Sequence, residues 1–382
     1  MLRILLFLLV ISPAFIHAQN IRVGLFSDKS IKEIEGIVGK GTYFVFKDTI
    51  QLAKLGPADV FKATYSGGVV RVLVNGVEKG RGKSIRLIQD KQEDYLQVRL
   101  ILPAAKQRSY EGDFDIEIRK EALNLINNLD METYLEGVVE SEGGPGQKLN
   151  YYKAQAVISR TYAMKYWSKH KDNGYNLCDR VHCQAYLHHR SATVTIDSAV
   201  HQTRGLVMID QGGELYPTYF HANCGGQTSE PHYVWNEEIP NLCSFKDTFC
   251  IHTQQAKWEK RIPKEQWTKF LVDKYSFPIG DSVSYALLEH FVQEQRSAFY
   301  IHPVYGIPLR DLREQFKLKS TFFDVDMEGE EMVLHGRGFG HGVGLCQEGA
   351  MNMAKKGYSF DQILGYYYPE MRLVDRTILI YK

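Results

Sequence analysis

The sequence predicts an α+β fold, with a β-rich amino-terminal unit followed by a mixed domain. Short runs of alternating apolar and polar residues fill residues 21–111 and are separated by Gly, Lys and Asp turns, which is typical of strands. From about Gly112 onward, helix-like and strand-like segments follow one another without regular alternation. Because a doubly wound sheet requires alternating strands and helices, this order favours α+β.

The chain of 382 residues has room for two units, which we place at residues 19–112 and 113–382. Residues 1–18 combine an early Arg3, an unbroken apolar run and a small residue at Ala18, as secretory signal peptides do. The run is short for a bilayer span, and no other stretch approaches its length. We therefore expect an exported protein, periplasmic or secreted, without a transmembrane segment after cleavage.

The elements follow in order along the chain. Strands are expected in IRVGLF, TYFVFKD, VVRVLVNG and DYLQVRLIL of the first unit. Segments 114–119 and 122–129 then lead into two helices, the second covering about 149–170. Further expected elements are strands at 192–196, 205–210, 215–222 and 377–381, and helices within 266–275 and 307–318.

The first of these helices should begin at Asp130, a residue type that caps helix amino termini. Tyr134, Leu135, Val138 and Val139 recur at helical spacing as its apolar stripe. Three acids, Glu132, Glu136 and Glu140, share the opposite face, which we expect to be solvated.

Glu142 is the acid of this helix best suited to catalysis. It lies in the last turn, before Gly143-Gly144-Pro145, which continues a helix poorly. The negative end of the helix dipole disfavours a second negative charge there, and packing against tyrosines adds a desolvation cost. We expect a raised pKa, although an ordinary helix-end glutamate satisfies the same local pattern.

Composition restricts the partners of the chain. Its 46 Lys and Arg nearly balance 45 Asp and Glu, giving a net charge of +1. This balance argues against a dedicated nucleic-acid binder, which usually shows a basic excess. The 23 tyrosines and four tryptophans suit a surface that stacks on sugar rings, and suit an aromatic core equally well.

Cysteine and histidine residues gather in one short segment. Cys178, His182 and Cys183 lie within six residues, and His170 upstream offers a fourth donor. Thiolates and imidazoles suit a tetrahedral zinc site without an open position, hence a structural one. A disulfide between Cys178 and Cys183 is the alternative. The other four cysteines, Cys224, Cys243, Cys250 and Cys346, allow three disulfide pairings between which the sequence does not choose.

Two glycine-containing segments also carry chemistry-bearing residues. The segment 336–350 alternates glycine with larger residues around His341, a backbone that permits close approach of a ligand. It lacks the strand, lysine and helix of a phosphate loop. The segment 220–228 places His221 and Cys224 around a Gly-Gly bend. A thiol peptidase pair is less favoured there than a disulfide.

Taken together, several motifs resemble the SpoIID/LytB family of bacterial cell-wall proteins. They are LNLINNLDMETYLEGVVESE, YYKAQAVISRTYA, HCQAY, TRGLVM with FHANCGGQT, LRDLREQFKLKSTFF and GRGFGHGVGLCQEGAMNMAKKGYSFDQILGYYYP. They occur in the family's order and cover most of residues 122–373.

The resemblance implies action on peptidoglycan. SpoIID proteins are lytic transglycosylases that cut glycan strands between N-acetylmuramic acid (MurNAc) and N-acetylglucosamine (GlcNAc), preferring strands without stem peptides. The LytB branch is associated with stimulating a partner amidase. The family's catalytic glutamate corresponds to Glu142, and its HC pair, which holds zinc in some members, corresponds to His182 and Cys183.

The chain departs from the family pattern in two places. Gly143-Gly144-Pro145 replaces the usual Met-Pro after the glutamate, and Cys224 and Cys346 replace serines. If the two serine motifs face each other, Cys224 and Cys346 are expected to form a disulfide, and Cys243 would pair with Cys250.

The expected reaction is lytic transglycosylation with one glutamate as acid and then base, since hydrolases generally require two carboxylates. Glu140 is a candidate helper. Candidate substrate contacts are Arg160, Tyr162, Gln184, His341 and Gln347. The rival hypotheses are a non-catalytic glycan-binding protein that recruits or stimulates a cell-wall amidase and, more weakly, a zinc hydrolase.

Overall fold

The computed structural model describes residues 19–187 and 193–376. It divides the chain into two units: the first extends to Tyr134 and includes Asp172–Asn176, and the second contains Leu135–Lys171 and the chain from Leu177. The expected signal peptide at 1–18 and the expected strand at 377–381 lie outside the described residues. The domain boundaries proposed from the sequence stay a prediction.

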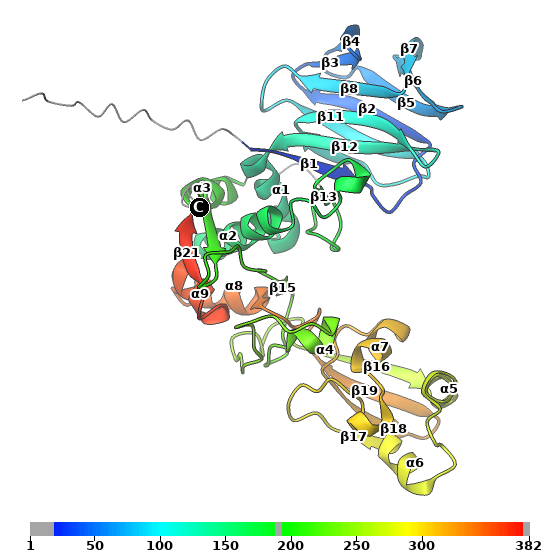
Figure 1. The fold of residues 1–382 in the computed structure, drawn as a ribbon, viewed down its shortest axis with the longest axis vertical. Coiled ribbons are helices and arrows are strands. Elements are labelled where there is room, and N and C mark those ends of the chain that lie inside the picture. Colours follow the sequence, from blue (N-terminus) through cyan, green and yellow to red (C-terminus); the bar gives the residue numbers. More distant parts are fainter. Residues whose placement is uncertain (1–18, 188–192, 377–382) are drawn as a thin grey trace, which may run out of the picture. The chain divides into compact units, whose positions relative to one another are not determined.

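Two antiparallel sheets form the first unit (Figure 1). In one, the strand order is β1 (Asn20–Leu25), β12 (Ala122–Asp130), β11 (Asp113–Arg119), β8 (Ser84–Gln89), β3 (Tyr43–Lys47) and β4 (Ile50–Leu55). In the other it is β10 (Arg108–Glu111), β9 (Tyr95–Leu102), β2 (Glu33–Lys40), β5 (Val60–Ser66), β6 (Val69–Val74) and β7 (Val77–Gly82).

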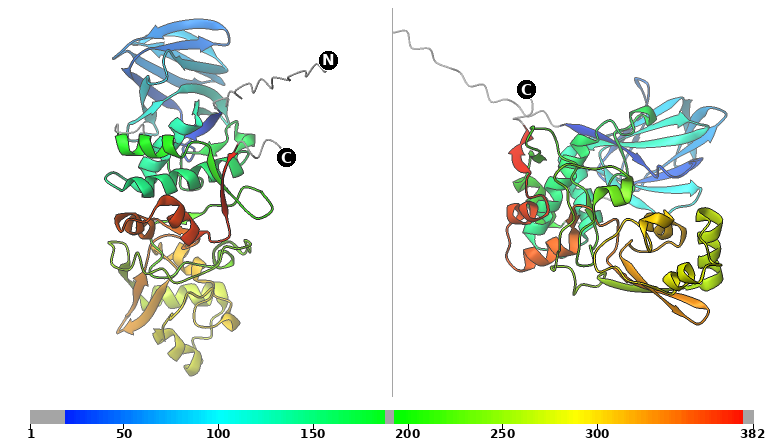
Figure 2. Two further views of the ribbon diagram at one scale, coloured as in Figure 1. Left: turned by 90° about the vertical axis from the view of Figure 1, so that its left-hand side faces the viewer. Right: turned by 60° about the horizontal axis from the view of Figure 1, so that its bottom comes forward.

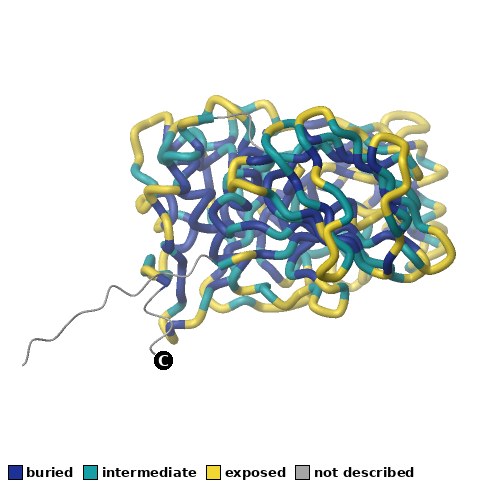
Figure 3. The backbone as a smooth tube through the Cα atoms, turned by 90° about the horizontal axis from the view of Figure 1, so that it is seen from above, coloured by how far each residue is buried: buried dark blue, intermediate teal, exposed yellow. Residues whose placement is uncertain are grey.

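The two sheets of the first unit share an apolar interior. Ile34 and Phe61 of one sheet and Leu87 and Phe114 of the other line the same small internal space, and all four are buried. Buried and less buried positions alternate along the strands, as expected when one face of each sheet meets a core (Figure 3). The unit is therefore a β-sandwich.

Helix α2 (Leu149–Lys165) is the central element of the second unit. It packs against α3 (Val194–Gln202), α8 (Gln347–Lys355), α9 (Phe360–Tyr367) and strand β14 (Leu206–Ile209), which pairs with β21 (Arg372–Asp375) (Figure 2). The parallel pair of β15 (Phe220–His221) and β20 (Leu345–Cys346) brings distant segments together. Other elements here include α1 (Met131–Gly143), which follows β12, the two-residue strand β13 (Leu177–Cys178) and the short helix α4 (Pro231–Trp235).

A separate antiparallel sheet lies between β15 and β20 in the sequence. Its order is β16 (Lys257–Pro263), β19 (Glu331–Arg337), β18 (Phe323–Glu328) and β17 (His290–Phe291). Helices α5 (Lys264–Tyr275) and α6 (Ser282–Glu289) pack on it, and α7 (Leu309–Gln315) joins the same apolar core around Trp267 (Figure 1). Together with the sandwich, this confirms the α+β fold class and the β-rich amino-terminal region.

Several sequence expectations about elements differ from the structure. Of the expected strand 215–222, only Phe220–His221 forms a strand, β15. The described part of the expected strand 192–196, residues 193–196, instead forms the cap and first turn of α3, because Ile196, Ala199 and Val200 bury one helical face against α2. Packing thus overrides the β propensity of a Thr-Val-Thr-Ile run. Helix α2 ends at Lys165 instead of near His170.

The acids of α1 also differ from expectation. The apolar stripe is fully buried, as predicted, but Glu132 and Glu140 are buried too, at 9% and 7% exposure. Helix α1 is therefore enclosed on more than one side, so the expected solvated face does not exist at these two positions. Among the described residues, no helix is both long and apolar enough to cross a membrane.

Candidate active site

Glu142 occupies the last turn of α1, as the sequence predicts. The helix starts directly after β12, where the Asp130 carboxylate accepts a hydrogen bond from the Glu132 amide at 2.9 Å. At the other end, Glu142 is half-buried, and its Oε1 accepts a hydrogen bond from the Ala185 amide at 2.7 Å. Burial raises the pKa of Glu142, and the Ala185 amide and Gln347 oppose this only partly. The side chain thus favours its protonated form more than an exposed glutamate does.

The segment Gly143-Gly144-Pro145, which replaces the Met-Pro of the family pattern, determines the shape of the turn after Glu142. A Cβ on Gly143 would lie 2.8 Å from Cε1 of Tyr151, so only glycine permits this close approach. Gly144 has a φ of +64°, which glycine adopts without strain. The hydroxyl of Tyr152 donates to the Gly144 carbonyl at 2.7 Å and accepts from the Gln147 amide at 3.0 Å. Two tyrosines of α2 therefore fix the turn.

Gln347, at the start of α8, is a direct neighbour of Glu142. Its Nε2 lies 3.4 Å from the Glu142 carbonyl oxygen and 3.4 Å from Oε1 of Gln155. The Tyr151 hydroxyl donates to the same Gln155 oxygen at 3.3 Å. Sequence reasoning missed Gln155 and Tyr151. Their spacing of four residues on α2 places them on one helical face, which is the signal that would have paired them.

Arg160 and Gln184, two candidate substrate contacts, lie in the interior. Both side chains are fully buried. Arg160 donates to the Leu206 carbonyl at 3.1 Å, and Gln184 donates to the Ser159 carbonyl at 3.2 Å. Gln184 directly precedes the Ala185 amide that holds Glu142. These positions suit support of the site more than contact with a glycan, and their proposed contacts stay predictions.

Four rings of the second unit form a continuous set that we call the aromatic row: Tyr166, Tyr219, Trp235 and His341. Ring centroids lie 6.3 Å apart for Tyr166 and Tyr219, 4.5 Å for Tyr219 and Trp235, and 5.2 Å for Trp235 and His341. The hydroxyls of Tyr166 and Tyr219 are hydrogen-bonded at 2.6 Å. Burial lowers the pKa of His341 to about 4, so this imidazole is neutral at physiological pH. Sequence reasoning selected only His341 of this row.

Two hollows adjoin the aromatic row. Tyr166 and Tyr219 line a cavity of about 370 Å³, and Trp235 lines another of about 590 Å³. Neither cavity is lined by Glu142. Strand β20 links the aromatic row to the surroundings of Glu142. The Leu345 amide donates a hydrogen bond to the Tyr219 carbonyl at 3.0 Å, and Leu345 lies two residues before Gln347, the neighbour of Glu142.

The four residues expected to bind zinc do come together. His170 Nε2 lies 3.3 Å from Cys183 Sγ, and His182 Nδ1 lies 3.7 Å from Cys178 Sγ and 3.9 Å from Cys183 Sγ. All four ligand atoms lie within 4.8 Å of one another. The contact between the two sulfurs lowers the pKa of Cys178 and raises the pKa of Cys183, so Cys178 is the first of the two to become the thiolate that binds metals. Tyr162 is next to this cluster and accepts a hydrogen bond from Lys169 at 3.1 Å.

The disulfide expectations are wrong in this structure. All six cysteines lie among the described residues, and all six are free, including Cys178 and Cys183. Cys224 and Cys346 do face each other, because the Cys224 amide donates to Cys346 Sγ at 3.3 Å. Cys250 joins them, at 3.2 Å from Cys224 Sγ, instead of pairing with the exposed Cys243.

Part of the chain matches a known family. Residues 119–209, which contain α1, Glu142 and the Cys/His cluster, match the family model SpoIID, described as stage II sporulation protein. This confirms the resemblance to the SpoIID/LytB family that the sequence motifs indicate.

Individual relatives agree with this class. The chain is 26% identical over 287 residues to stage II sporulation protein D of Bacillus subtilis, covering 70% of this chain and 81% of that protein. It is 27% identical to an uncharacterised protein of Brachyspira hyodysenteriae, covering 70% and 72%. The amidase enhancer of Bacillus subtilis is 26% identical and covers 62% of this chain, which spans 39% of that relative's length.

Proposed function

We propose that this protein is a peptidoglycan lytic transglycosylase that uses Glu142 as its only acid and base. The observation that carries the proposal is a half-buried carboxyl with a raised pKa at the end of α1, held through one oxygen by a main-chain amide. A general acid needs a pKa near the working pH and an atom that reaches the substrate. Membership of the matched relatives in a family of cell-wall proteins supports the substrate class.

The position of the proton follows from the hydrogen bond to Ala185. An amide only donates, so Oε1 is the acceptor and the acidic hydrogen belongs on Oε2 of Glu142. In the first step Oε2 gives this proton to the glycosidic oxygen, and the bond from that oxygen to C1 of MurNAc breaks. The carboxylate then takes the proton of the MurNAc C6 hydroxyl, whose oxygen bonds to C1. The 1,6-anhydro product forms without water, and Glu142 is protonated again.

The surroundings of Glu142 suit both protonation states. Burial favours the neutral acid before the first step, whereas the Ala185 amide stabilises the carboxylate between the steps. A hydrolase would need a second carboxylate on the other side of the sugar. A single glutamate with a raised pKa is sufficient when the C6 hydroxyl of the same sugar attacks C1.

The aromatic row supplies a surface for the glycan strand. Sugar rings stack on aromatic faces, and Trp235 is 38% exposed next to the half-buried Tyr219. The cavity beside Tyr166 and Tyr219 is within the range of small-ligand sites. A neutral His341 offers hydrogen bonding to hydroxyl groups without a charge.

The Cys/His cluster serves as a structural zinc site in this proposal. Two thiolates and two imidazoles are a complete tetrahedral donor set, which leaves no position for an activated water. His170 follows α2, and Cys183 directly precedes Gln184 and the Ala185 amide that holds Glu142. Zinc there would fix this segment against α2, which argues against a zinc hydrolase.

An amidase-stimulating protein is the second candidate function. The observation that favours it is the similarity to the amidase enhancer of Bacillus subtilis. On that hypothesis the aromatic row would bind glycan and Glu142 would contact sugar without chemistry. Export to the cell wall, through the leader expected at residues 1–18, belongs to both hypotheses.

The deciding experiment uses purified glycan strands without stem peptides. Incubation with the mature protein should yield fragments ending in 1,6-anhydro-MurNAc, detected by mass spectrometry, and the Glu142→Gln variant should yield none. A parallel reaction contains intact peptidoglycan and a cell-wall amidase. Absence of anhydro ends together with faster amidase release of peptides would replace the lytic proposal with the stimulating one.

A further inference from the structure

A second cluster of metal-binding side chains lies in the interior of the second unit, apart from the Cys/His cluster. Cys224, Asp247, Cys250 and Cys346 place one ligand atom each within 4.8 Å of the others. All four residues have no solvent exposure. They come from three segments: the loop after β15, the loop 242–256, and the residue that caps α8.

The distances in this cluster do not fit a disulfide. Cys224 Sγ lies 3.2 Å from Cys250 Sγ and 3.3 Å from Asp247 Oδ2. A disulfide requires sulfurs about 2.05 Å apart. Ligands around zinc, with bonds of about 2.0 to 2.3 Å, stand roughly 3.3 to 3.8 Å from one another in a tetrahedron. The observed separations are close to the second arrangement.

The outer hydrogen bonds of the cluster resemble those around metal ligands. The amides of Cys224 and Gly349 donate to Cys346 Sγ at 3.3 and 3.4 Å. The Tyr367 hydroxyl donates to Asp247 Oδ2 at 2.9 Å, and the Phe249 amide donates to Asp247 Oδ1 at 2.9 Å. Such bonds orient ligands and stabilise their anionic forms.

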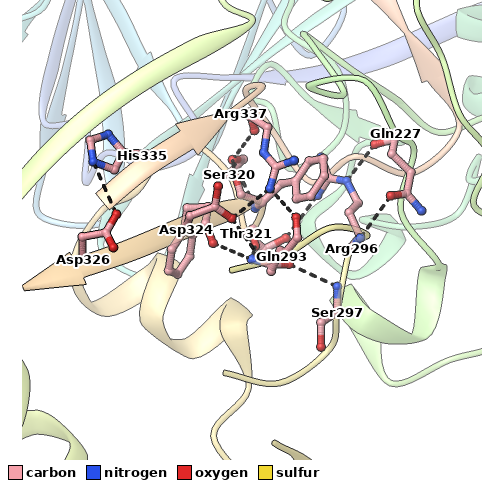
Figure 4. Close-up of polar contacts among 12 residues, drawn as sticks. Gln227, Gln293, Arg296, Ser297, Ser320, Thr321, Asp324, Asp326, His335 and Arg337 are labelled. Carbon is pink, nitrogen blue, oxygen red and sulfur yellow. Dashed lines mark hydrogen bonds and ion pairs between the residues drawn. The ribbon is translucent and has the colours of Figure 1, made fainter. Parts of the chain in front are cut away.

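Four ionised groups buried this closely together would be stable only with a cation at their centre. Arg296 is a buried cation next to this loop, but its guanidinium donates to the carbonyl oxygens of Cys224 and Gln227, both at 2.7 Å, and to Thr321 at 3.3 Å. Figure 4 shows Arg296 beside Gln227. It therefore fixes the backbone of the Cys224 loop without bonding the thiols. Burial alone destabilises carboxylates and thiolates, whereas coordination to a metal ion stabilises them.

We propose that Cys224, Asp247, Cys250 and Cys346 bind one zinc ion, as a second and fully enclosed structural site. Three thiolates and one carboxylate are a soft, closed tetrahedral set that leaves no place for water or substrate. The ion joins the Gly-Gly loop, the loop 242–256 and the start of α8. Because Gln347 directly follows Cys346 and contacts Glu142, this ion also positions a neighbour of the candidate acid.

The competing state is oxidation. A disulfide between two of the three cysteines would leave one thiol and Asp247 enclosed without a cation. In that state the protein would be lighter by two hydrogens, and one peptide pair from this cluster would be cross-linked.

The first test is the metal content of the purified mature protein by elemental analysis. We expect two zinc ions per chain, one per cluster. Cys250→Ser and Asp247→Asn should each reduce this to one, Cys183→Ser should remove the other ion, and the exposed Cys243→Ser is the matched control that keeps both. One ion per chain, unaffected by Cys250→Ser, would overturn the proposal, as would iron in place of zinc.

The second test uses the unaltered protein, so it does not depend on whether a variant folds. Cys224, Cys250 and Cys346 should resist alkylation until a chelator is added, and cobalt substitution should give the charge-transfer absorption of several thiolates. A cross-linked peptide among these three cysteines, or alkylation that a chelator does not change, would refute the zinc site. Both readouts are independent of glycan cleavage.

Discussion

Glu142 and Asp247 are two carboxyl groups of the second unit whose pKa values are shifted in the same direction but whose solvent exposure differs. Burial raises the pKa of both. Glu142 is half-buried, with one main-chain amide at 2.7 Å, whereas Asp247 has no solvent exposure and lies among three thiols. A raised pKa therefore does not identify an acid catalyst by itself. Only the carboxyl that reaches the surface can exchange a proton with a substrate.

The largest expected effect tests the accessible carboxyl. Glu142→Gln should lower the rate of anhydro-product formation by about 10²–10⁴-fold, because general acid–base catalysis usually contributes that much. Glu136→Gln, on the same helix and also partly exposed, is the control and should retain the wild-type rate. Mass spectrometry of the products measures both. Near-native formation of anhydro ends by Glu142→Gln would contradict the assignment.

The pH dependence sharpens the same comparison. Because catalysis starts from protonated Glu142, the rate should fall about tenfold per pH unit above a pKa that exceeds the usual value of about 4.3. Folding raises the pKa of Glu142, so its protonated form stabilises the folded protein. This stabilisation is complete below the pKa of the unfolded chain and is lost as the pH rises through the pKa of the folded protein.

A thermal measurement checks the sign of that effect. Glu142→Gln cannot ionise, so its melting temperature should fall less than that of the wild type between about pH 4 and about pH 8. An equal fall in both proteins would show that Glu142 carries no raised pKa.

Gln347 should have an intermediate effect. Its hydrogen bonding lowers the pKa of Glu142, so Gln347→Ala should move the alkaline limb of the rate profile to higher pH and lower the rate by about tenfold. Gln202→Ala, an exposed glutamine on α3, is the control. A lower rate without a shift in the profile would mean that Gln347 only supports the fold.

The smallest expected effect concerns glycan binding. Trp235→Ala should weaken binding of stem-peptide-free strands by about 2- to 10-fold, the range of one aromatic contact. Tyr358→Ala is a matched control, because both side chains are 38% exposed. Affinity is measured by sedimentation with insoluble glycan. Equal losses in both variants would remove the aromatic row from the binding surface.

Local sequence patterns were sufficient for much of the fold and for the acid. The cap at Asp130, the apolar stripe of α1 and the Gly-Gly-Pro stop are all encoded within a few residues of Glu142, and the structure has each of them. The close spacing of Cys178, His182 and Cys183 likewise indicated their cluster. Strand alternation indicated the β-rich first unit.

Features assembled from distant segments were not predictable in this way. Asp247 and Cys250 meet Cys224 and Cys346 only through tertiary structure, so counting cysteines suggested disulfides instead. The aromatic row joins rings from the residue that follows α2, from α4 and from two loops. Helix α3 was missed because its β-branched residues favour strands until α2 covers one of its faces.

The absence of a side chain at Gly143 also limits how the protein can change. Tyr151 lies so near that even a methyl group at position 143 would displace its ring. That ring is hydrogen-bonded to Gln155, which in turn contacts Gln347. Any larger residue beside the acid would therefore disturb three neighbours at once, so natural variants of this chain should keep glycine there or alter Tyr151 in the same step.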